Sequence, residues 1–424
     1  MDAPESYNRP MAEPHYPRFA EPALVEALAD SPVVLVHGPR QCGKTTLARL
    51  VGKRLGYEYL TFDDEVPCGA AEADPSGFVA ELPDRVILDE VQRVPALFAA
   101  LKSTIDRKRA PGRFLLTGSA NVMLVPTLSD SLAGRMAVLR LHPLSQCELS
   151  RRAPRFLDAL FSARFKTRQS ERLGKELLDR VAAGGYPAAL ARPPGHRRAA
   201  WYRDYLDALV QRDVRALARI SSLDALPRLL ALAGAQTARL LNVSDLASPF
   251  QLSRPTIRDY ITLLERVFLL DIVPPWHTNR LSRLIKTPKV HLGDSGLACA
   301  LLGVDAAGLA ADRPLFGQLL ETFVYQELRR QGSAGESPFT FTHFRDKDGV
   351  EVDIVIERGV QALAGVEVKA SATVTAADFR GLRKLRDAAG KRFAAGVVLY
   401  DGETMATFGD GLFAVPVRAL WEPP

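Results

Sequence analysis

A glycine-rich segment of eight residues, 38–45, has the composition of a loop that binds phosphate groups. It follows the apolar run 33–36 and precedes the helix-compatible stretch 46–50. Glycines let backbone N–H groups turn inward around phosphate oxygens, and the following helix presents the positive end of its dipole. Lys44 is expected to reach the β- and γ-phosphates, and the Thr45 hydroxyl to bind magnesium. The sequence therefore predicts that a nucleoside triphosphate is bound by Gly38, Pro39, Arg40, Gln41, Cys42, Gly43, Lys44, Thr45 and Thr46.

Hydrolysis also requires a second strand that ends in acidic residues, and residues 85–90 provide such a strand. The apolar run there ends in Asp89 and Glu90. Asp89 is expected to hold magnesium, directly or through water, and Glu90 to polarise the attacking water. The pair predicts ATP hydrolysis with ATP and Mg2+ as cofactors.

Two more segments place polar residues at the ends of expected strands, 114–119 and 136–141. Their order resembles that of AAA-type ATPases, whose sensor strand carries a polar residue near the γ-phosphate. The sensor candidates are Thr117, Ser119 and Asn121. The same resemblance gives Arg135 the position of an arginine finger. It would complete the site of a neighbouring copy, so that hydrolysis depends on a homo-oligomer.

Length and composition are typical of a soluble protein with more than one domain. The 424 residues are 47% hydrophobic and 25% charged, which is ordinary for globular chains. No apolar run approaches the roughly 20 residues that a membrane span needs, and the first residues lack a signal pattern. We expect a cytoplasmic location without a membrane partner. The four cysteines are far apart, which predicts reduced thiols and no zinc site.

A winged-helix pattern with a basic loop lies in the middle of the chain. Helices are expected at 243–247 and from Ser253, which is a suitable N-cap, and strands at 268–273 and 289–292. Apolar residues recur at helical spacing and would face the core. The net charge of +6 permits nucleic acid as a partner. The expected DNA contacts are Arg254, Arg258, Arg280, Arg283, Lys286 and Lys289. Alternatively, such a module docks protein.

A second group of chemically active residues lies near the end of the chain, in strands expected at 350–356 and 366–369. Asp353 lies on the first strand. Glu367 and Lys369 lie on one face of the next, because side chains two apart in a strand point the same way. The two carboxylates would hold a metal and generate hydroxide, while Lys369 would stabilise charge on a phosphate.

These residues resemble the PD-(D/E)XK nuclease core, particularly archaeal Holliday-junction resolvases, over roughly residues 315–420. That family supplies a further glutamate from a preceding helix. Family spacing selects Glu321, whereas the helical wheel favours Glu327. We take Glu321 as the candidate and leave Glu327 open. Val352 stands where the family's proline would be, and the domain either cleaves DNA or keeps the fold without cleavage.

Nearly the whole chain after residue 17 resembles prokaryotic ATPases in which a AAA-type P-loop domain precedes domain of unknown function 4143. The motifs Gly185-Tyr186-Pro187 and Asp294-Ser295-Gly296 stand in the family's order. The fold class expected is α/β, with a parallel-sheet P-loop NTPase domain of AAA type, a helical and winged-helix middle domain and a restriction-endonuclease-like C-terminal domain. The expected divisions are a flexible N-terminus at 1–17, the ATPase domain at 18–150, a lid or helical connector at 151–200, the helical and winged-helix domain at 201–305 and the nuclease-like domain at 306–424.

The sequence thus predicts a magnesium-dependent ATPase that hydrolyses ATP to control engagement of DNA, with metal-dependent cleavage by the C-terminal domain left open. The alternative is a signalling or toxin-type ATPase whose C-terminal domains bind protein and never contact DNA. A salt-dependent mobility shift with DNA separates these two functions.

Overall fold

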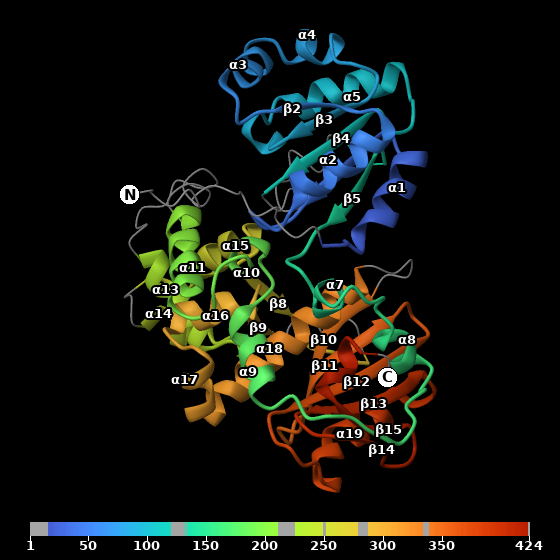
Figure 1. The fold of residues 1–424 in the computed structure, drawn as a ribbon, viewed down its shortest axis with the longest axis vertical. Helices are drawn as coiled ribbons and strands as arrows, with labels where there is room; N and C mark the ends of the chain where they lie inside the picture. Colours follow the sequence, from blue (N-terminus) through green and yellow to red (C-terminus); the bar gives the residue numbers. More distant parts are fainter. Residues whose placement is uncertain are drawn as a thin grey trace, which may run out of the picture.

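In a computed structural model, the part of the chain that is described forms three β-sheets. Figure 1 shows the N-terminal sheet at the top and the C-terminal sheet at the bottom. The structure describes residues 16–119, 132, 134–210, 225–248, 252–278, 287–333 and 339–422. Within these residues, no helix combines the length and the apolar character needed to cross a bilayer. Four residues considered above lie outside the described part: Asn121, Arg280, Arg283 and Lys286.

The N-terminal sheet is entirely parallel, with the strand order β2-β3-β4-β1-β5. Its central strands are continuous apolar runs because helices cover both faces. Successive residues of β1 enter two different cores, one against α1 and α2 and the other against α5. The elements are α1 Ala20–Asp30, β1 Val33–His37, α2 Lys44–Leu55, β2 Glu58–Thr61, α3 Glu65–Ala73, α4 Pro75–Ala80, β3 Val86–Asp89, α5 Leu97–Arg107, β4 Phe114–Gly118 and β5 Met136–Arg140.

The position of β4 between β1 and β3 decides where the candidate nucleotide site lies. All three strands run the same way, so their carboxyl ends meet at one edge of the sheet. The hydroxyl groups that end β4 therefore lie between the glycine-rich loop after β1 and the acids after β3.

The middle of the chain forms a helical body with a three-stranded antiparallel sheet of order β7-β9-β8. Helix α15 begins after Ser253, whose hydroxyl accepts a hydrogen bond from the Thr256 amide at 3.2 Å. The elements are α9 Lys175–Ala183, α10 Pro187–Leu190, α11 His196–Leu209, α13 Ala225–Ala235, β7 Arg239–Leu240, α14 Val243–Ala247, α15 Arg254–Arg266, β8 Leu270–Val273, β9 Lys289–Leu292, α16 Ser295–Leu302 and α17 Ala306–Ala311.

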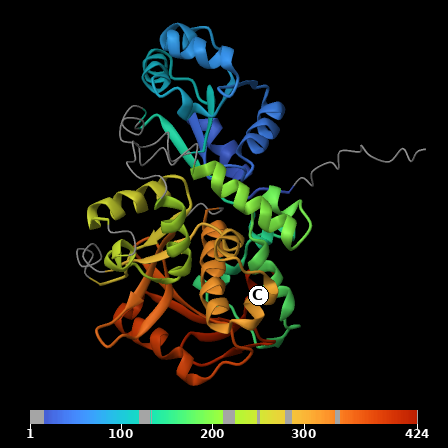
Figure 2. The same ribbon diagram turned by 90° about the vertical axis from the view of Figure 1, so that its left-hand side faces the viewer.

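The C-terminal sheet has seven strands in the order β10-β11-β12-β13-β15-β14-β6. Helix α18 packs between this sheet and the middle body, and α19 covers the sheet on another side (Figure 2). The elements are α18 Arg313–Gly332, β10 Phe339–Arg345, β11 Glu351–Arg358, β12 Ala362–Lys369, α19 Arg380–Ala389, β13 Phe393–Tyr400, β14 Thr404–Thr407 and β15 Leu412–Pro416. Short 3-10 turns lie at Val91–Arg93, Ala376–Phe379, Gly390–Arg392 and Val417–Leu420.

The segment 151–200 corrects our expectation of a single lid or helical connector. After α7 (Gln146–Leu149), helix α8 (Phe156–Phe161) packs against β12 and β13, because its apolar side chains complete the core under the C-terminal sheet. Strand β6 (Arg168–Gln169) then pairs with β14 as the last strand of that sheet. In contrast, α9 packs against α16 and α17 of the middle body. The segment is therefore divided between two parts of the molecule.

Candidate functional site

The glycine-rich loop between β1 and α2 has the backbone shape that the sequence predicts. Gly43 adopts a φ of 101°, which favours glycine. At Gly38, a Cβ would lie 2.1 Å from the carbonyl oxygen of Leu141, so no larger residue fits. The Lys44 ammonium is buried and donates to the Pro39 carbonyl at 2.9 Å. The loop is thus a cradle of backbone amides with one lysine beside it.

Asp89, at the end of β3, is surrounded by hydroxyl groups. The Thr45 hydroxyl lies 3.0 Å from both of its carboxylate oxygens, and the Tyr59 hydroxyl donates to it at 2.8 Å. The Thr117 hydroxyl, from the end of β4, also donates to it. A hydroxyl and a carboxylate side by side are ligands that magnesium accepts. Thr45 and Asp89 therefore fit the metal that the nucleotide would bring.

Glu90 is positioned separately from Asp89, because its backbone turns into the left-handed region at φ 57°. Its carboxylate accepts hydrogen bonds from the Ser119 hydroxyl at 3.0 Å and from the Gln92 amide. Gln92 also donates to the Ser119 hydroxyl at 2.9 Å. These contacts hold the Glu90 carboxylate between the ends of β3 and β4, at the edge of the sheet where the glycine-rich loop also lies.

Sequence reasoning missed several residues that support this site. The Arg18 guanidinium donates to the Cys42 carbonyl at 2.7 Å and pairs with Glu148 at 3.0 Å, which ties the loop to the end of the domain. The Tyr205 hydroxyl of α11 contacts the Arg40 carbonyl at 3.4 Å. A lone arginine near the N-terminus carries no pattern that would have revealed it. The roles of Tyr59 and Gln92 likewise depend on contacts that exist only in the folded protein, so the sequence did not reveal them.

Arg135 lies immediately before β5, at the edge of the N-terminal sheet. Its Nε donates to the Asp106 carboxylate at 2.5 Å, so it forms an ion pair within its own chain. A role as an arginine finger toward another copy stays a prediction.

A second acidic site forms where β11, β12 and α18 meet. The structure brings together the four predicted residues, Glu321, Asp353, Glu367 and Lys369, and adds Lys289 from β9. The Lys289 ammonium lies 2.7 Å from the Glu321 carboxylate and 3.3 Å from that of Asp353. Lys369 pairs with Glu367 at 2.8 Å. We call these five residues the C-terminal acidic site.

Burial dominates the electrostatics of the C-terminal acidic site. Burial and then the charge of Asp353 raise the pKa of Glu321 to about 8 and that of Glu367 to about 8. Burial opposes the charge of Lys289, but Glu321 and Asp353 outweigh it and raise its pKa above the ordinary value. One oxygen of the Glu367 carboxylate is buried without a hydrogen-bond partner. Burial thus outweighs the attraction of the lysines at Glu321 and Glu367 and favours the protonated form of both acids.

Lys289, which the sequence predicts as a DNA contact, is buried in the structure. Only 3% of its side chain is exposed, because β9 turns it inward toward two carboxylates. A metal bound to Glu321 and Asp353 would have to share the space and the charge of this ammonium. Among the described residues, no group of three or more His, Cys, Asp or Glu side chains is arranged to hold a metal ion. The two predicted metal ligands, Asp353 and Glu367, are each already paired with a lysine, so the residues present do not fit the predicted metal.

Glu327 takes part in a different network from that of Glu321. Its carboxylate accepts from the Gln146 amide at 2.8 Å and from Arg330 at 3.1 Å. Arg330 also pairs with Asp294 at 2.9 Å, and Asp294 accepts from the Gly185 amide at 2.8 Å. The Gly-Tyr-Pro and Asp-Ser-Gly motifs therefore meet in a buried junction between the end of the N-terminal domain, the middle body and α18.

Of the residues expected to contact DNA, Arg254 and Arg258 are exposed on α15. The apolar residues of that helix, including Ile257 and Leu264, are buried as expected. The two arginines therefore remain available as contacts.

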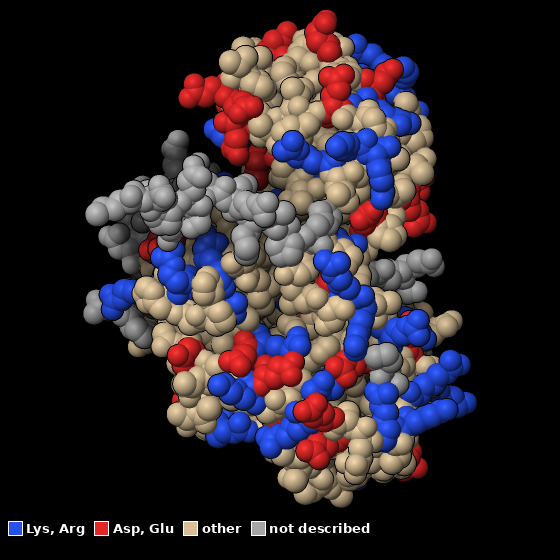
Figure 3. Space-filling view, viewed as in Figure 1, with Lys and Arg blue, Asp and Glu red and all other residues tan. Residues whose placement is uncertain are grey.

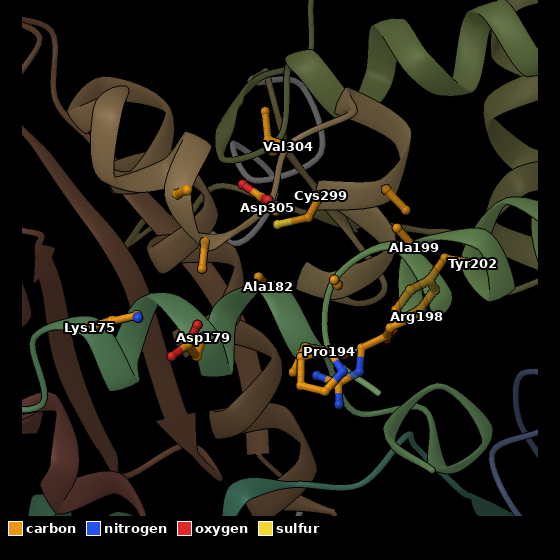
Figure 4. Close-up of a pocket in the computed structure, with 16 residues that line it drawn as sticks. Lys175, Asp179, Ala182, Pro194, Arg198, Ala199, Tyr202, Cys299, Val304 and Asp305 are labelled. Carbon is orange, nitrogen blue, oxygen red and sulfur yellow. Dashed lines mark hydrogen bonds between the residues drawn. The ribbon is translucent and has the colours of Figure 1, made fainter. Parts of the chain in front are cut away.

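A cavity of about 460 Å3 lies in the middle body, between α9, α11 and α16 (Figure 4). Small side chains form much of its wall, and Lys175, Asp179 and Arg198 add charge. Tyr202 lines it and donates to the Ala183 carbonyl at 2.9 Å. The cavity contains none of the site residues predicted from the sequence.

Comparison with known proteins shows the family to which this architecture belongs. Two relatives, uncharacterized protein Rv2008c of Mycobacterium tuberculosis and uncharacterized protein Mb2031c of Mycobacterium bovis, are each 30% identical over 406 residues, covering 95% of this chain and 84% of theirs. The chain belongs to their family. Its parts match the AAA domain at 30–150, a domain of unknown function (DUF8612) at 174–308 and a domain of unknown function (DUF4143) at 316–420. The match to the AAA domain, together with the geometry of the glycine-rich loop, shows that this protein is a nucleotide-hydrolysing ATPase.

Solved structures also resemble the chain. The Walker-type ATPase PABY2304 of Pyrococcus abyssi is 17% identical with a TM-score of 0.41, covering 68% of this chain and 97% of its own. The Holliday junction branch migration motor RuvB of Thermotoga maritima is 19% identical with a TM-score of 0.27, covering 60% of this chain and 89% of its own.

Proposed function

We propose that this chain couples magnesium-dependent ATP hydrolysis to engagement of DNA by its middle body. In the hydrolysis step, the loop amides and Lys44 hold the phosphates, and Thr45 with Asp89 would hold the magnesium. Bound magnesium neutralises charge on the β- and γ-phosphates. Glu90 polarises the attacking water, while Ser119 and Gln92 orient its carboxylate.

The observation that carries the coupling is a direct contact between the end of β5 and the sheet of the middle body. Arg140, the last residue of β5, pairs with Asp271 of β8 at 3.3 Å, and its guanidinium lies 4.9 Å from the centre of the Phe268 ring. The His37 ring, at the end of β1, packs edge-on against the same Phe268 at 5.5 Å. A change at the nucleotide site therefore has a short mechanical route to β8.

The order α13, β7, α14, α15, β8 and β9 supports a winged-helix interpretation of the middle body. In such a module the second helix enters a groove of DNA. Arg254 and Arg258 are exposed near the start of α15. A second basic surface lies around α8, where lysine and arginine gather at the lower right of Figure 3. Its exposed residues include Arg151, Arg152, Arg155, Arg164, Lys166 and Arg168.

The experiment measures ATP turnover and mobility shifts over a panel of duplex and branched DNA. We expect DNA to bind with a strong dependence on salt and to change the turnover rate. The double variant Arg254→Ala/Arg258→Ala should weaken binding, and the matched pair Arg155→Ala/Arg164→Ala on the α8 surface should not. No shift at low salt would refute DNA engagement, and a larger loss from the α8 pair would move the contact there.

The second candidate function is a signalling or toxin-type ATPase whose C-terminal domains bind protein. The C-terminal acidic site favours it, because Lys289 stands where a nuclease metal would be held. For the same reason we propose no cleavage step. ATP turnover that is indifferent to every DNA in the panel, without a mobility shift, is the result that would favour this function.

The dependence of hydrolysis on a second copy is tested by mixing inactive variants. Arg135→Ala and Lys44→Ala proteins should each lose turnover, and a mixture should recover part of it if Arg135 acts on a neighbour. Full turnover by Arg135→Ala protein on its own, or a mixture with no more turnover than its two components give separately, would refute the finger.

A further inference from the structure

The C-terminal acidic site contains a positive charge that comes from a different part of the fold. Lys289 belongs to β9 of the middle body, whereas Glu321 and Asp353 belong to α18 and β11. The ammonium lies within hydrogen-bond distance of Glu321, at 2.7 Å, and 3.3 Å from an Asp353 oxygen. The other Asp353 oxygen accepts from the Val368 amide at 2.9 Å, so both oxygens have partners.

We propose that the Lys289 ammonium is the resident cation of the C-terminal acidic site, and that a divalent metal enters only when Lys289 is withdrawn. A magnesium or manganese ion binds carboxylate oxygens at roughly 2.0–2.2 Å. An ion in contact with both Glu321 and Asp353 would occupy the space of the Lys289 nitrogen and repel its charge. Lysine and metal are therefore mutually exclusive ligands of the same two carboxylates.

The surroundings of β9 keep Lys289 in this position. The backbone beyond β8 pairs with β10, with the His343 amide donating to the Pro274 carbonyl at 3.1 Å and the Trp276 amide to the His343 carbonyl at 2.5 Å. The Gln326 amide of α18 donates to the Leu292 carbonyl of β9 at 2.8 Å. Strand β9 is thus fixed to α18, which carries Glu321, and the segment after β8 is fixed to β10, which pairs with the strand that carries Asp353. Withdrawal of Lys289 requires the middle sheet to separate from α18 and β10.

This proposal does not depend on ATP hydrolysis or on DNA. Lys289 of the middle body acts as the counter-ion of two carboxylates in the C-terminal domain. The acidic site therefore helps to hold the two domains together. Metal chemistry at the site then becomes conditional on an opened arrangement of the domains.

The test measures manganese binding to full-length protein without nucleotide, by electron paramagnetic resonance and calorimetry. Lys289→Met keeps the length of the side chain and removes the charge. We expect this variant to gain one site at least tenfold tighter than any in the wild type, and Lys289→Met/Asp353→Asn to lose it. Lys289→Arg serves as the charged control and should gain none. An Asp353-dependent site in the wild type, or no gained site in folded Lys289→Met, would overturn the proposal.

A second measurement covers the case in which Lys289→Met does not fold. The triple variant Lys289→Met/Glu321→Gln/Asp353→Asn removes all three charges while keeping their shapes. We expect it to fold and to have a higher thermal midpoint than Lys289→Met alone. A triple variant that is equally or more damaged would mean that the lysine stem, and not its charge, is what the fold needs, and this would refute the role of Lys289 as the resident cation.

Discussion

The nucleotide site and the C-terminal acidic site each place carboxylates beside a buried lysine, but the lysines have different partners. Lys44 donates to a backbone carbonyl, and Asp89 is held by hydroxyl groups. Lys289 instead pairs directly with Glu321 and Asp353. A metal ion can displace the hydroxyl groups around a carboxylate without leaving an unpaired charge. A carboxylate in an ion pair with lysine is already neutralised, and a metal ion that displaced the lysine would leave its charge unpaired. A group of acidic residues therefore predicts a metal site only when no cation of the protein reaches it.

The largest effect is expected at the nucleotide site. Glu90→Gln should lower ATP turnover by about a hundredfold or more, because a neutral amide cannot polarise the attacking water. Nucleotide binding should persist, since the loop and Lys44 are unchanged. Steady-state turnover and a fluorescent-nucleotide titration check this result. Glu58→Gln, at an exposed position of β2, is the matched control. Retained turnover in Glu90→Gln would remove Glu90 from the mechanism.

The two buried lysines give the second prediction, on stability. Lys289→Met should cost about 3 kcal/mol of unfolding free energy, because it leaves two buried carboxylates unpaired. Lys44→Met should cost less than about 1 kcal/mol, because it loses only a bond to a carbonyl. Denaturant unfolding followed by tryptophan fluorescence measures both. Equal losses of unfolding free energy in the two variants would contradict the proposed difference between the two lysines.

The third prediction concerns the orientation of Glu90. Ser119→Ala should reduce turnover about tenfold, equal to about 1.4 kcal/mol in the barrier, with little change in KM. The hydroxyl supports the carboxylate and does not touch the phosphates in our proposal. Ser103→Ala, at an exposed position on α5, is the control. If KM rises while kcat stays constant, Ser119 acts in binding instead.

These outcomes also show what the sequence could and could not supply. The glycine-rich loop could be predicted because all of its residues are adjacent in the sequence. Asp89 and Glu90 could be predicted because they directly follow an apolar run that forms a strand. The helical wheel favoured Glu327 because that residue is the more deeply buried of the two, but it could not show that Glu327 pairs with Arg330 whereas Glu321 pairs with Lys289. Lys289 was misassigned because its partners lie 32 and 64 residues away in the chain. A run of basic residues does not reveal which member turns inward.

The smallest effect is expected at Glu265, an acid near the end of α15. Burial and then Asp271 raise its pKa to about 7, so the folded protein favours its protonated form. Stability is therefore lost as pH rises from about 4.5 to 7, where the unfolded chain ionises first. Glu265→Gln should be more stable than the wild type by about 1 kcal/mol at pH 8, because solvent screens this half-buried side chain and reduces the effect well below the full value, and equal to it below pH 4.5. Thermal unfolding at both pH values measures this, and a difference independent of pH would contradict it.

Strand β6 has a consequence for how the polypeptide is made. Residues 168–169 leave the ribosome long before β14, their partner strand at 404–407. The N-terminal sheet can form early, but the apolar side of α8 stays uncovered until β12 and β13 have been translated. A fragment that begins after residue 200 would lack α8 and this strand, and it should be prone to aggregate. Folding of α8 and β6 therefore cannot be completed until the strands that they contact have been translated.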